Sequence, residues 1–186
     1  MITIGLTGTI GAGKGTIVEY LKTQGFTHYP ARDFLIREVV KRGLEPIREN
    51  ITVVANDLRK IHSPDYIISE LSKERATNPG NAIIESIRNL GEIDYLRKTI
   101  PNFYLFAVDA DLKLRYERIL ERGLSTDHIS FEQFVIDENK EMDSKELWKQ
   151  NIRACISQAD FVFENNGTIE ELSVKVEEVL KNLTNK

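Results

Sequence analysis

The stretch GLTGTIGAGKGT, residues 5 to 16, restricts the possible folds of this chain more than any other. Five glycines fall within eleven residues, although glycine loses more conformational entropy on folding than other residues. The stretch overlaps an apolar run at 2–7, typical of a buried strand, and leads into an apolar helical pattern at 14–23. The sequence therefore predicts a strand, a tight glycine loop and a helix in direct succession.

The glycine loop fits the G-x4-G-K pattern of a phosphate-binding loop, or P-loop. Its main-chain N–H groups would point at a phosphate, and the following helix would add its positive N-terminal end. Lys14 supplies a cation for the β- and γ-phosphates. A glycine-rich turn with a solvated lysine explains the residue types and spacing less well. We expect these residues to bind ATP: Gly8, Gly11, Ala12, Gly13, Lys14, Gly15 and Thr16.

Strand patterns and helix patterns alternate along the rest of the chain. Strands are predicted at 2–7, 26–30, 81–87, 103–108 and 160–164. Helices are predicted at 14–23, 32–43, 50–62, 64–76, 90–99, 111–122, 130–142, 145–157 and 168–183, and Ser63 is expected to cap the fourth of them. This alternation predicts one domain over 1–186, an α/β protein of three α/β/α layers with a five-stranded parallel sheet.

Composition narrows the class of partner and the compartment. The net charge of −4 disfavours a nucleic-acid-binding protein, and no apolar run approaches the roughly 20 residues of a membrane span. The chain begins without a signal-peptide pattern. Cys155 is the only cysteine, so we expect a packed core thiol and a cytoplasmic protein. We expect the protein to be a monomer or a homodimer.

Several P-loop classes lack their sequence signatures here. A GTPase needs an N-K-x-D motif to read guanine, but NKEM at 139–142 ends in methionine, and no D-x-x-G occurs. A large mechanical ATPase carries an apolar strand ending in aspartate, whereas AIIES offers only Glu85. These absences favour a small kinase.

Three arginines in LRYERILERG share one face of a predicted helix. Arg115, Arg118 and Arg122 lie at i, i+3 and i+7, and like charges at this spacing destabilise a helix by about 0.2–0.5 kcal/mol. A bound polyphosphate would offset this repulsion. Alternatively, nearby acids neutralise the arginines, and Asp137 or Glu138 would pair with them when no nucleotide is bound.

The G-K-G-T loop and the RILER stretch (118–122) resemble the adenylate-kinase group of nucleoside monophosphate kinases. The resemblance implies that Arg118 stacks on adenine and that Arg122 contacts phosphates. It also implies that Thr16 contacts an ATP phosphate and that Mg²⁺ is held mostly through water. Lys14, Arg118 and Arg122 would then be catalytic, and a short helical segment at about 123–146 would be the lid.

The ending QADFVFENNGTIEEL (158–172) resembles dephospho-coenzyme A kinases and archaeal adenylate-kinase-related proteins. The resemblance implies that the turn of Asn165, Asn166 and Gly167 packs against adenine. Thr168 is predicted to cap the last helix. An ordinary tight turn with a good cap explains the same residues.

The acceptor side is predicted from weaker similarities. ARDFLIRE (31–38) is similar to the D-x-L-R stretch of adenylate kinases, which implies that Asp33 and Arg37 face an acceptor site formed by helices at about 32–76. A surface Asp–Arg pair is the alternative. The same resemblance makes Arg88 a clamp for the acceptor phosphate, and Glu85, at a strand end, a ligand for Mg²⁺ through water.

Other candidates receive no site role from the sequence. Glu92 and Arg97 are expected to serve helix solubility or packing. The histidines His28, His62 and His128 lie far apart, without metal-site spacing.

Together these features predict an Mg²⁺- and ATP-dependent kinase that phosphorylates a nucleoside monophosphate or a similar small nucleotide. Two alternatives remain. The acceptor would be dephospho-coenzyme A, although IIES replaces the Pro-Leu-Leu segment of that family. Otherwise the chain would be an ATP-binding regulator with slow ATPase activity.

Overall fold

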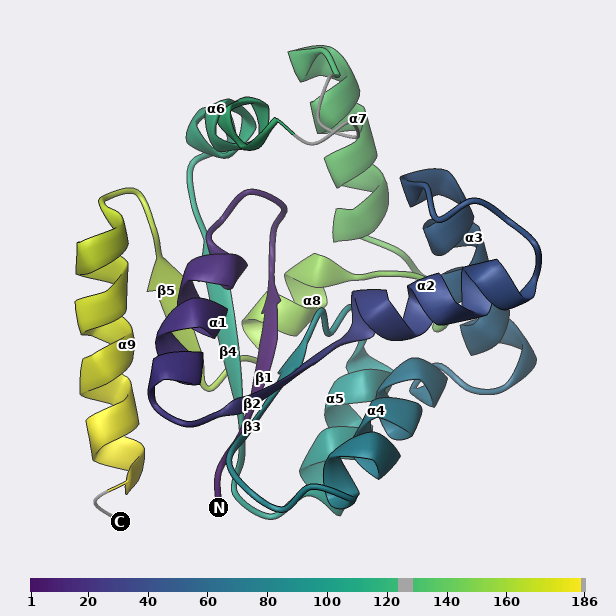
Figure 1. Ribbon diagram of the computed structural model, residues 1–186. Coiled ribbons are helices and arrows are strands. Elements are labelled where there is room, and N and C mark those ends of the chain that lie inside the picture. Colours follow the sequence, from purple (N-terminus) through teal and green to yellow (C-terminus); the bar gives the residue numbers. More distant parts are fainter. Residues whose placement is uncertain (124–128, 185–186) are drawn as a thin grey trace.

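The computed structural model describes residues 1–123 and 129–184. Its centre is a five-stranded sheet in the order β2-β3-β1-β4-β5, in which every pairing is parallel (Figure 1). The three-layer α/β/α fold predicted from the sequence is confirmed. The strands are β1 Thr3–Gly8, β2 Thr27–Pro30, β3 Ala82–Glu85, β4 Phe103–Asp109 and β5 Phe161–Glu164.

Helices connect these strands and cover both faces of the sheet. The chain winds from β1 outward to β2, returns to β3 and then crosses to β4, so its direction of winding changes beside β1. Open parallel sheets bind ligands at such a switch point. The helices are α1 Lys14–Thr23, α2 Ala31–Lys41, α3 Arg48–Ile61, α4 Tyr66–Ala76, α5 Leu90–Thr99, α6 Leu112–Arg122, α7 Phe131–Met142, α8 Ile152–Ser157 and α9 Ile169–Thr184.

The helix predicted at 145–157 is wrong over its first half. Only Ile152–Ser157 is helical, because Asn151 holds the chain in another conformation. The Asn151 main-chain N–H donates to the oxygen of Arg88 at 2.7 Å, and its side-chain oxygen accepts from Ala154. Helix α4 likewise begins later than predicted, with Asp65 rather than Ser63 at its N-cap position. Most of the predicted loop at 123–129, His128 included, lies outside the described residues.

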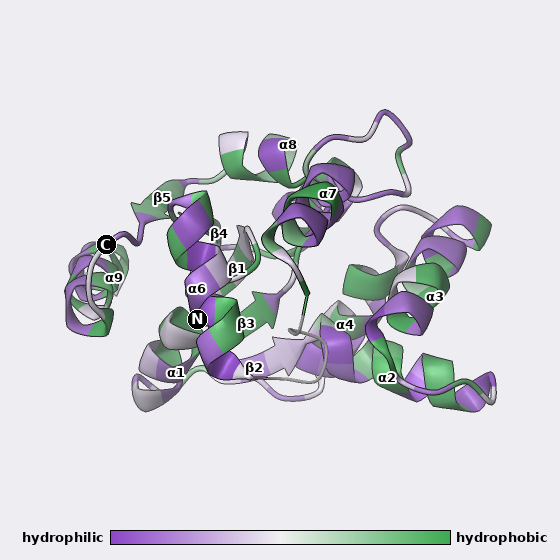
Figure 2. Cartoon of the chain, turned by 90° about the horizontal axis from the view of Figure 1, so that it is seen from above, coloured by the Kyte–Doolittle hydropathy of each residue, from purple (hydrophilic) through white to green (hydrophobic). Residues whose placement is uncertain are grey.

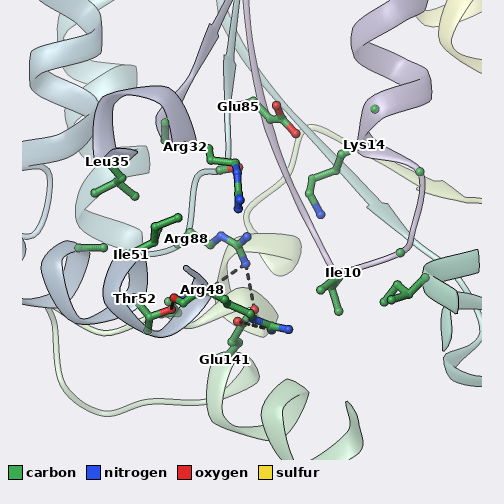
Figure 3. Close-up of a pocket in the computed structure, with 18 of the residues that line it drawn as sticks. Ile10, Lys14, Arg32, Leu35, Arg48, Ile51, Thr52, Glu85, Arg88 and Glu141 are labelled. Atoms are coloured by element: carbon green, nitrogen blue, oxygen red, sulfur yellow. Dashed lines mark hydrogen bonds and ion pairs between the residues drawn. The ribbon is translucent and has the colours of Figure 1, made fainter. Parts of the chain in front are cut away.

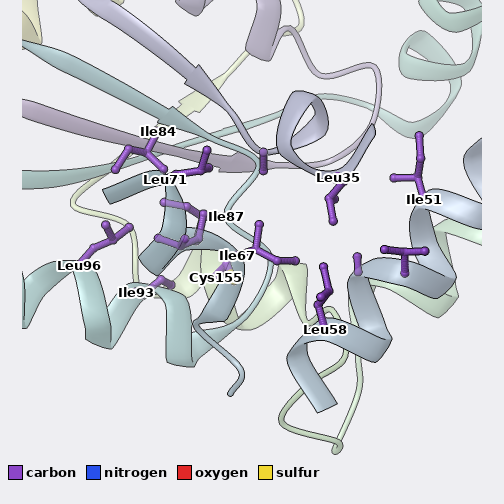
Figure 4. Close-up of a cluster of buried hydrophobic side chains, with 14 of the residues drawn as sticks. Leu35, Ile51, Leu58, Ile67, Leu71, Ile84, Ile87, Ile93, Leu96 and Cys155 are labelled. Carbon is purple, nitrogen blue, oxygen red and sulfur yellow. The ribbon is translucent and has the colours of Figure 1, made fainter. Parts of the chain in front are cut away.

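The two faces of the sheet have separate apolar cores. Helices α1 and α9 cover one face (Figure 1), and Ile4 and Leu6 of β1 point into this core. The other face packs against α4, α5 and α8, with α2 and α3 extending the same cluster (Figure 4). As expected, Cys155 is buried in that core, and burial raises the pKa of its thiol to about 12.

The polar end of the molecule lies at the carboxyl ends of the strands. Figure 2 looks onto this end, where α6 and α7 carry many hydrophilic residues beside the loop that follows β1. Over residues 1–123 and 129–184, none of the helices is long and apolar enough to cross a membrane. The fold therefore gathers the P-loop and the charged helices at one edge of the sheet.

Candidate active site

A cavity of about 730 Å³ lies at this edge of the sheet (Figure 3). Its wall is formed by the P-loop, the start of α2, one face of α3, the segment after β3, and parts of α6 and α7. Its lining is strongly cationic although the whole chain is acidic. Among the described residues of the wall, the acids are Glu85 and Glu141. The bases are Lys14 and six arginines: Arg32, Arg48, Arg59, Arg88, Arg118 and Arg122. The cavity is therefore suited to a polyanion.

The conformation of the P-loop requires glycine at three positions. Gly8, Gly11 and Gly13 all have positive φ angles, which side chains rarely adopt. A Cβ atom on Gly8 would lie 2.0 Å from the main-chain oxygen of Val108. On Gly13 it would lie 2.4 Å from the side-chain nitrogen of Asn165. These glycines are needed for the loop to pack against β4 and the turn after β5.

Gly15 differs from the other glycines of the loop. Its φ angle is not positive, and a Cβ atom there would meet no protein atom within 4 Å. Gly15 is exposed and lines the cavity beside Lys14 and Thr16. Packing within the protein does not explain this glycine, whereas a phosphate chain passing close to the backbone would.

The ammonium group of Lys14 is folded back onto its own loop. Its Nζ donates to the main-chain oxygens of Gly8 at 2.9 Å and Thr9 at 2.7 Å. The pKa of Lys14 is lowered to about 7, mainly by burial and then by the charge of Arg88. Glu85 acts in the opposite direction without restoring the ordinary value. Lys14 thus lacks sufficient negative charge around it, and a bound phosphate would supply that charge.

Glu85 ends β3 inside the cavity, as the sequence predicts. Its Oε2 lies 2.9 Å from Nε2 of His28, a residue to which sequence spacing assigns no role. Burial alone would raise the pKa of Glu85. The hydrogen bond and charge of His28, helped by Lys14 and Arg88, outweigh burial and place this pKa below its ordinary value. Glu85 is therefore a carboxylate at neutral pH.

The proposed metal ligands fit the way in which kinases hold Mg²⁺. Thr16 and Glu85 both line the cavity, and Mg²⁺ is commonly bound through one or two protein groups, substrate phosphates and water. The described part of the chain contains no group of three or more His, Cys, Asp or Glu residues able to hold a metal. Thr16 and Glu85 offer two oxygen donors, which suits a metal whose other ligands are phosphates and water.

The three arginines of α6 do not act as one group. Arg115 is buried and forms a two-pronged ion pair with Glu138 of α7, so the alternative of neutralisation by a nearby acid holds for this residue. Asp137 pairs with Lys140 instead. Arg118 and Arg122 both line the cavity.

The turn after β5 binds the main chain of the P-loop through a side chain. The buried side chain of Asn165 donates to the oxygen of Ala12 at 2.8 Å. Arg118 donates to the main-chain oxygens of Asn165 at 2.9 Å and Gly167 at 3.1 Å. Neither Asn165 nor Gly167 lines the cavity. Thr168 caps α9 through its hydroxyl and the N–H of Glu171, as predicted.

The structure does not bring Asp33 and Arg37 to the cavity, which corrects the expectation that both face it. Ala31, Arg32 and Leu35 line the wall instead, and residues two positions further along a helix lie about 200° around its axis. Arg37 is exposed and pairs with Glu74 at 3.3 Å. Arg88, by contrast, lies in the cavity wall, as predicted.

Sequence reasoning missed one face of α3, which brings two arginines and a threonine to the cavity. Arg48, Thr52, Ala55 and Arg59 all line the cavity. Their spacing of four, three and four residues is that of one helix face, and this pattern could have revealed them. The contribution of Glu141 on α7 could not be found in this way, because it depends on how α7 packs across the cavity.

Glu92 serves packing rather than helix solubility, which is one of the two roles expected from the sequence. It is fully buried and accepts from Nε of Arg59 at 3.0 Å. It also accepts from the main-chain N–H groups of Arg88 at 2.6 Å and Asn89 at 3.3 Å. Glu92 therefore holds the turn that carries Arg88 into the cavity.

Comparisons with known proteins agree with this fold. The model of a family described as an AAA domain matches residues 4–149. A UPF0200 protein of Thermococcus kodakarensis is 32% identical over 191 aligned residues, which cover 100% of both chains.

Solved structures carry the same architecture. TT1252 from Thermus thermophilus superposes with a TM-score of 0.65 at 22% identity, covering 98% of this chain and 97% of its own. Shikimate kinase from Aquifex aeolicus superposes with a TM-score of 0.60 at 14% identity, covering 97% of each chain. The fold is therefore the P-loop NTPase fold that shikimate kinase also has, and by sequence the chain belongs to the family of AAA domains and, with its relatives, to the UPF0200 proteins.

Proposed function

We propose that this chain is a kinase that transfers the γ-phosphoryl group of ATP to a nucleoside monophosphate or a similar small nucleotide. One observation supports the proposal above all others. A single cavity joins the P-loop and Lys14 to a second group of cations, Arg32, Arg48 and Arg88, on its other side (Figure 3). Two anionic groups could bind there at once, which phosphoryl transfer between two phosphates requires.

The donor side would hold the triphosphate of ATP. Main-chain N–H groups of the loop and the start of α1 would bind the phosphates, and the open space beside Gly15 would admit them. Lys14 would leave the oxygens of Gly8 and Thr9 for the β- and γ-phosphates. Arg118 and Arg122, on the α6 side of the cavity, would contact adenine and phosphates as the resemblance to adenylate kinases implies.

The acceptor side would hold a molecule with an anionic group and a less polar body. Arg32, Arg48 and Arg88 supply the charge, while Ala31, Leu35, Ile51 and Ala55 form an apolar part of the same wall. A nucleoside monophosphate has this composition, because its phosphate is charged and its base has flat apolar faces. The small side chains of Ala31 and Ala55 also leave room for a ring.

In the proposed reaction, an oxygen of the acceptor phosphate attacks the γ-phosphorus of ATP. A bond forms between that oxygen and the phosphorus, the bond to the β–γ bridging oxygen breaks, and ADP leaves. The chain would contribute chiefly by positioning the two phosphates and neutralising their charge. Mg²⁺, held through Thr16, Glu85 and the phosphates, would add to this neutralisation.

The test is to incubate the purified protein with ATP labelled in its γ-phosphate, Mg²⁺, and a panel of nucleoside monophosphates and dephospho-coenzyme A. A labelled nucleoside diphosphate supports the proposal and identifies the acceptor. Labelled coenzyme A would assign the chain to the dephospho-coenzyme A alternative. Labelled inorganic phosphate alone would contradict the kinase proposal and favour a regulator with slow ATPase activity.

Two lysine variants make the assay specific to the P-loop. Lys14→Ala should remove nearly all turnover, because the developing charge loses its main protein cation. Lys22→Ala lies on the same helix but pairs with Glu19 on the surface, and it should keep full turnover. Unchanged turnover in a folded Lys14→Ala variant, checked by thermal melting, would contradict the assignment.

A further inference from the structure

A carboxylate of the protein itself lies among the arginines of the acceptor side. Oε1 of Glu141 accepts from Nη2 of Arg48 at 3.2 Å, and its Oε2 accepts from Nη1 of Arg88 at 3.0 Å (Figure 3). These three residues come from α7, α3 and the segment after β3, respectively. Each oxygen thus meets a different guanidinium, as the oxygens of a bound anion would.

The charges at this position do not balance. Arg48 and Arg88 carry two positive charges against the single negative charge of Glu141. Arg32 is exposed and points toward the same part of the cavity (Figure 3), and its side chain makes no hydrogen bond or ion pair with the described residues. Gln150 also accepts from Arg88, at 3.1 Å, but it is neutral. A phosphate dianion would satisfy this group of cations better than the Glu141 carboxylate does.

We propose that Arg48 and Arg88, with Arg32, form the binding site for the phosphate of the acceptor, and that Glu141 occupies this site as an internal competitor. The acceptor phosphate would displace the Glu141 side chain and bind the guanidinium groups of Arg48 and Arg88 in its place. Arg48 thereby becomes a substrate-binding residue and Glu141 a specificity-determining residue. This inference rests on the proposed function for its ligand, while the site itself rests on the contacts of Glu141.

An internal carboxylate selects among acceptors by their charge. A group tethered next to its site competes at an effective concentration of about a millimolar or more. A neutral sugar hydroxyl cannot replace the Glu141 carboxylate, because it carries no charge. A carboxylate ligand has the same single charge as Glu141 and therefore gains little by replacing it. A phosphate brings a second negative charge and three oxygens to planar donors that bind such groups in pairs. Glu141 would thus favour phosphorylated acceptors over other small molecules.

The test measures the binding of inorganic phosphate, rather than turnover, by isothermal titration calorimetry. Glu141→Gln keeps the shape of the side chain but removes its charge. It should lower the phosphate dissociation constant by about tenfold, because the competitor is lost. Glu146→Gln is the matched control, since Glu146 is an exposed acid paired with Lys149. It should leave the dissociation constant unchanged.

Arg48→Gln completes a double-variant cycle. The four proteins are the parent, the two single variants and the double variant. Phosphate binding at the P-loop contributes equally to the affinity of each and cancels when their affinities are compared. If the site is as proposed, Glu141→Gln strengthens binding much less in the Arg48→Gln background than in the parent, because Glu141 then holds only Arg88. Equal affinities of parent and Glu141→Gln protein would overturn the proposal, as would an equal gain in both backgrounds. Thermal melts check folding, and Glu141→Ala serves as a second variant.

The outcome separates this inference from the proposed function. Tighter phosphate binding that depends on Arg48, in a protein that phosphorylates none of the panel, would keep the site and reject the kinase. If the protein is a kinase but Glu141→Gln changes neither its acceptor KM nor its phosphate affinity, the proposed function stands and Glu141 is not a competitor. Acetate, titrated in parallel, should bind more weakly than phosphate to the Glu141→Gln protein.

Discussion

Asn165 donates a hydrogen bond of 2.8 Å from its buried side chain to the main-chain oxygen of Ala12, across 153 positions of sequence. The same nitrogen would lie only 2.4 Å from a Cβ atom placed on Gly13. The turn after β5 therefore fixes the P-loop in place, and the glycine spacing of the loop depends on this distant side chain.

Gly13→Ala and Gly15→Ala should have opposite consequences. At Gly13 the new methyl group collides with Asn165 in a backbone conformation with φ of 108°, so unfolding free energy should fall by about 1–3 kcal/mol. At Gly15 the methyl group meets no protein atom, so stability should hold or rise. ATP affinity should nevertheless fall about tenfold at Gly15 if the phosphates need that space. Urea melts and calorimetry measure the two quantities.

ATP binding should take up a proton through Lys14 near pH 8. The pKa of Lys14 is lowered to about 7 in the ligand-free protein, so much of this side chain is neutral at pH 8. Negatively charged phosphates beside Nζ would raise that pKa and return the proton. Calorimetry in buffers of different ionisation enthalpy reports the uptake, and Lys14→Met should abolish it. Equal uptake by both proteins would show that another group titrates.

The same lowered pKa gives a pH dependence of stability. Between pH 7 and the ordinary value of 10.5, the unfolded chain holds a proton on Lys14 that the folded chain has released. The contribution of Lys14 to stability therefore rises with pH across this window. Below pH 7 both states are protonated, and the full penalty of burial remains. The unfolding free energy of the parent minus that of Lys14→Met should thus increase from pH 7 to pH 9.

Arg88→Ala should raise the acceptor KM far more than the KM for ATP. Arg88 lies on the acceptor side, and losing a hydrogen bond to a charged group weakens binding by roughly tenfold to a hundredfold. Arg97→Ala provides the control, because Arg97 binds Gln158 and Asp160 outside the cavity. Initial rates over both substrate concentrations give the two constants. Equal shifts of both would place Arg88 elsewhere in the reaction.

Glu92→Gln should destabilise the fold strongly. Its buried partner Arg59 would be left without a countercharge, and breaking one side of a buried ion pair costs about 3–5 kcal/mol. The turn carrying Arg88 would also lose the negative charge of its acceptor, and one of the two acceptor oxygens would become an amide donor. Glu74→Gln, in the exposed pair with Arg37, should change stability by less than about 1 kcal/mol. Urea denaturation of the three proteins measures the difference.

Much of this molecule follows from residues close together in the sequence. The alternation of apolar patterns predicts the strands and their order of α and β elements, because periodicity is set by neighbouring residues. The spacing of Gly8, Gly13 and Lys14 predicts the phosphate loop for the same reason. Arg118 and Arg122 could be placed on one helix face, and Glu85 at a strand end, by local geometry alone.

The tertiary structure decided which of these charges meet. It buried Arg115 against Glu138 and turned Arg37 away from the cavity. It also delayed the start of the helix predicted at 145–157 to Ile152, by tying Asn151 to the oxygen of Arg88. It also placed Glu141 between two arginines, one 93 and the other 53 positions away. Helical periodicity says which residues share a face, but only the packing of one helix against another determines what that face contacts.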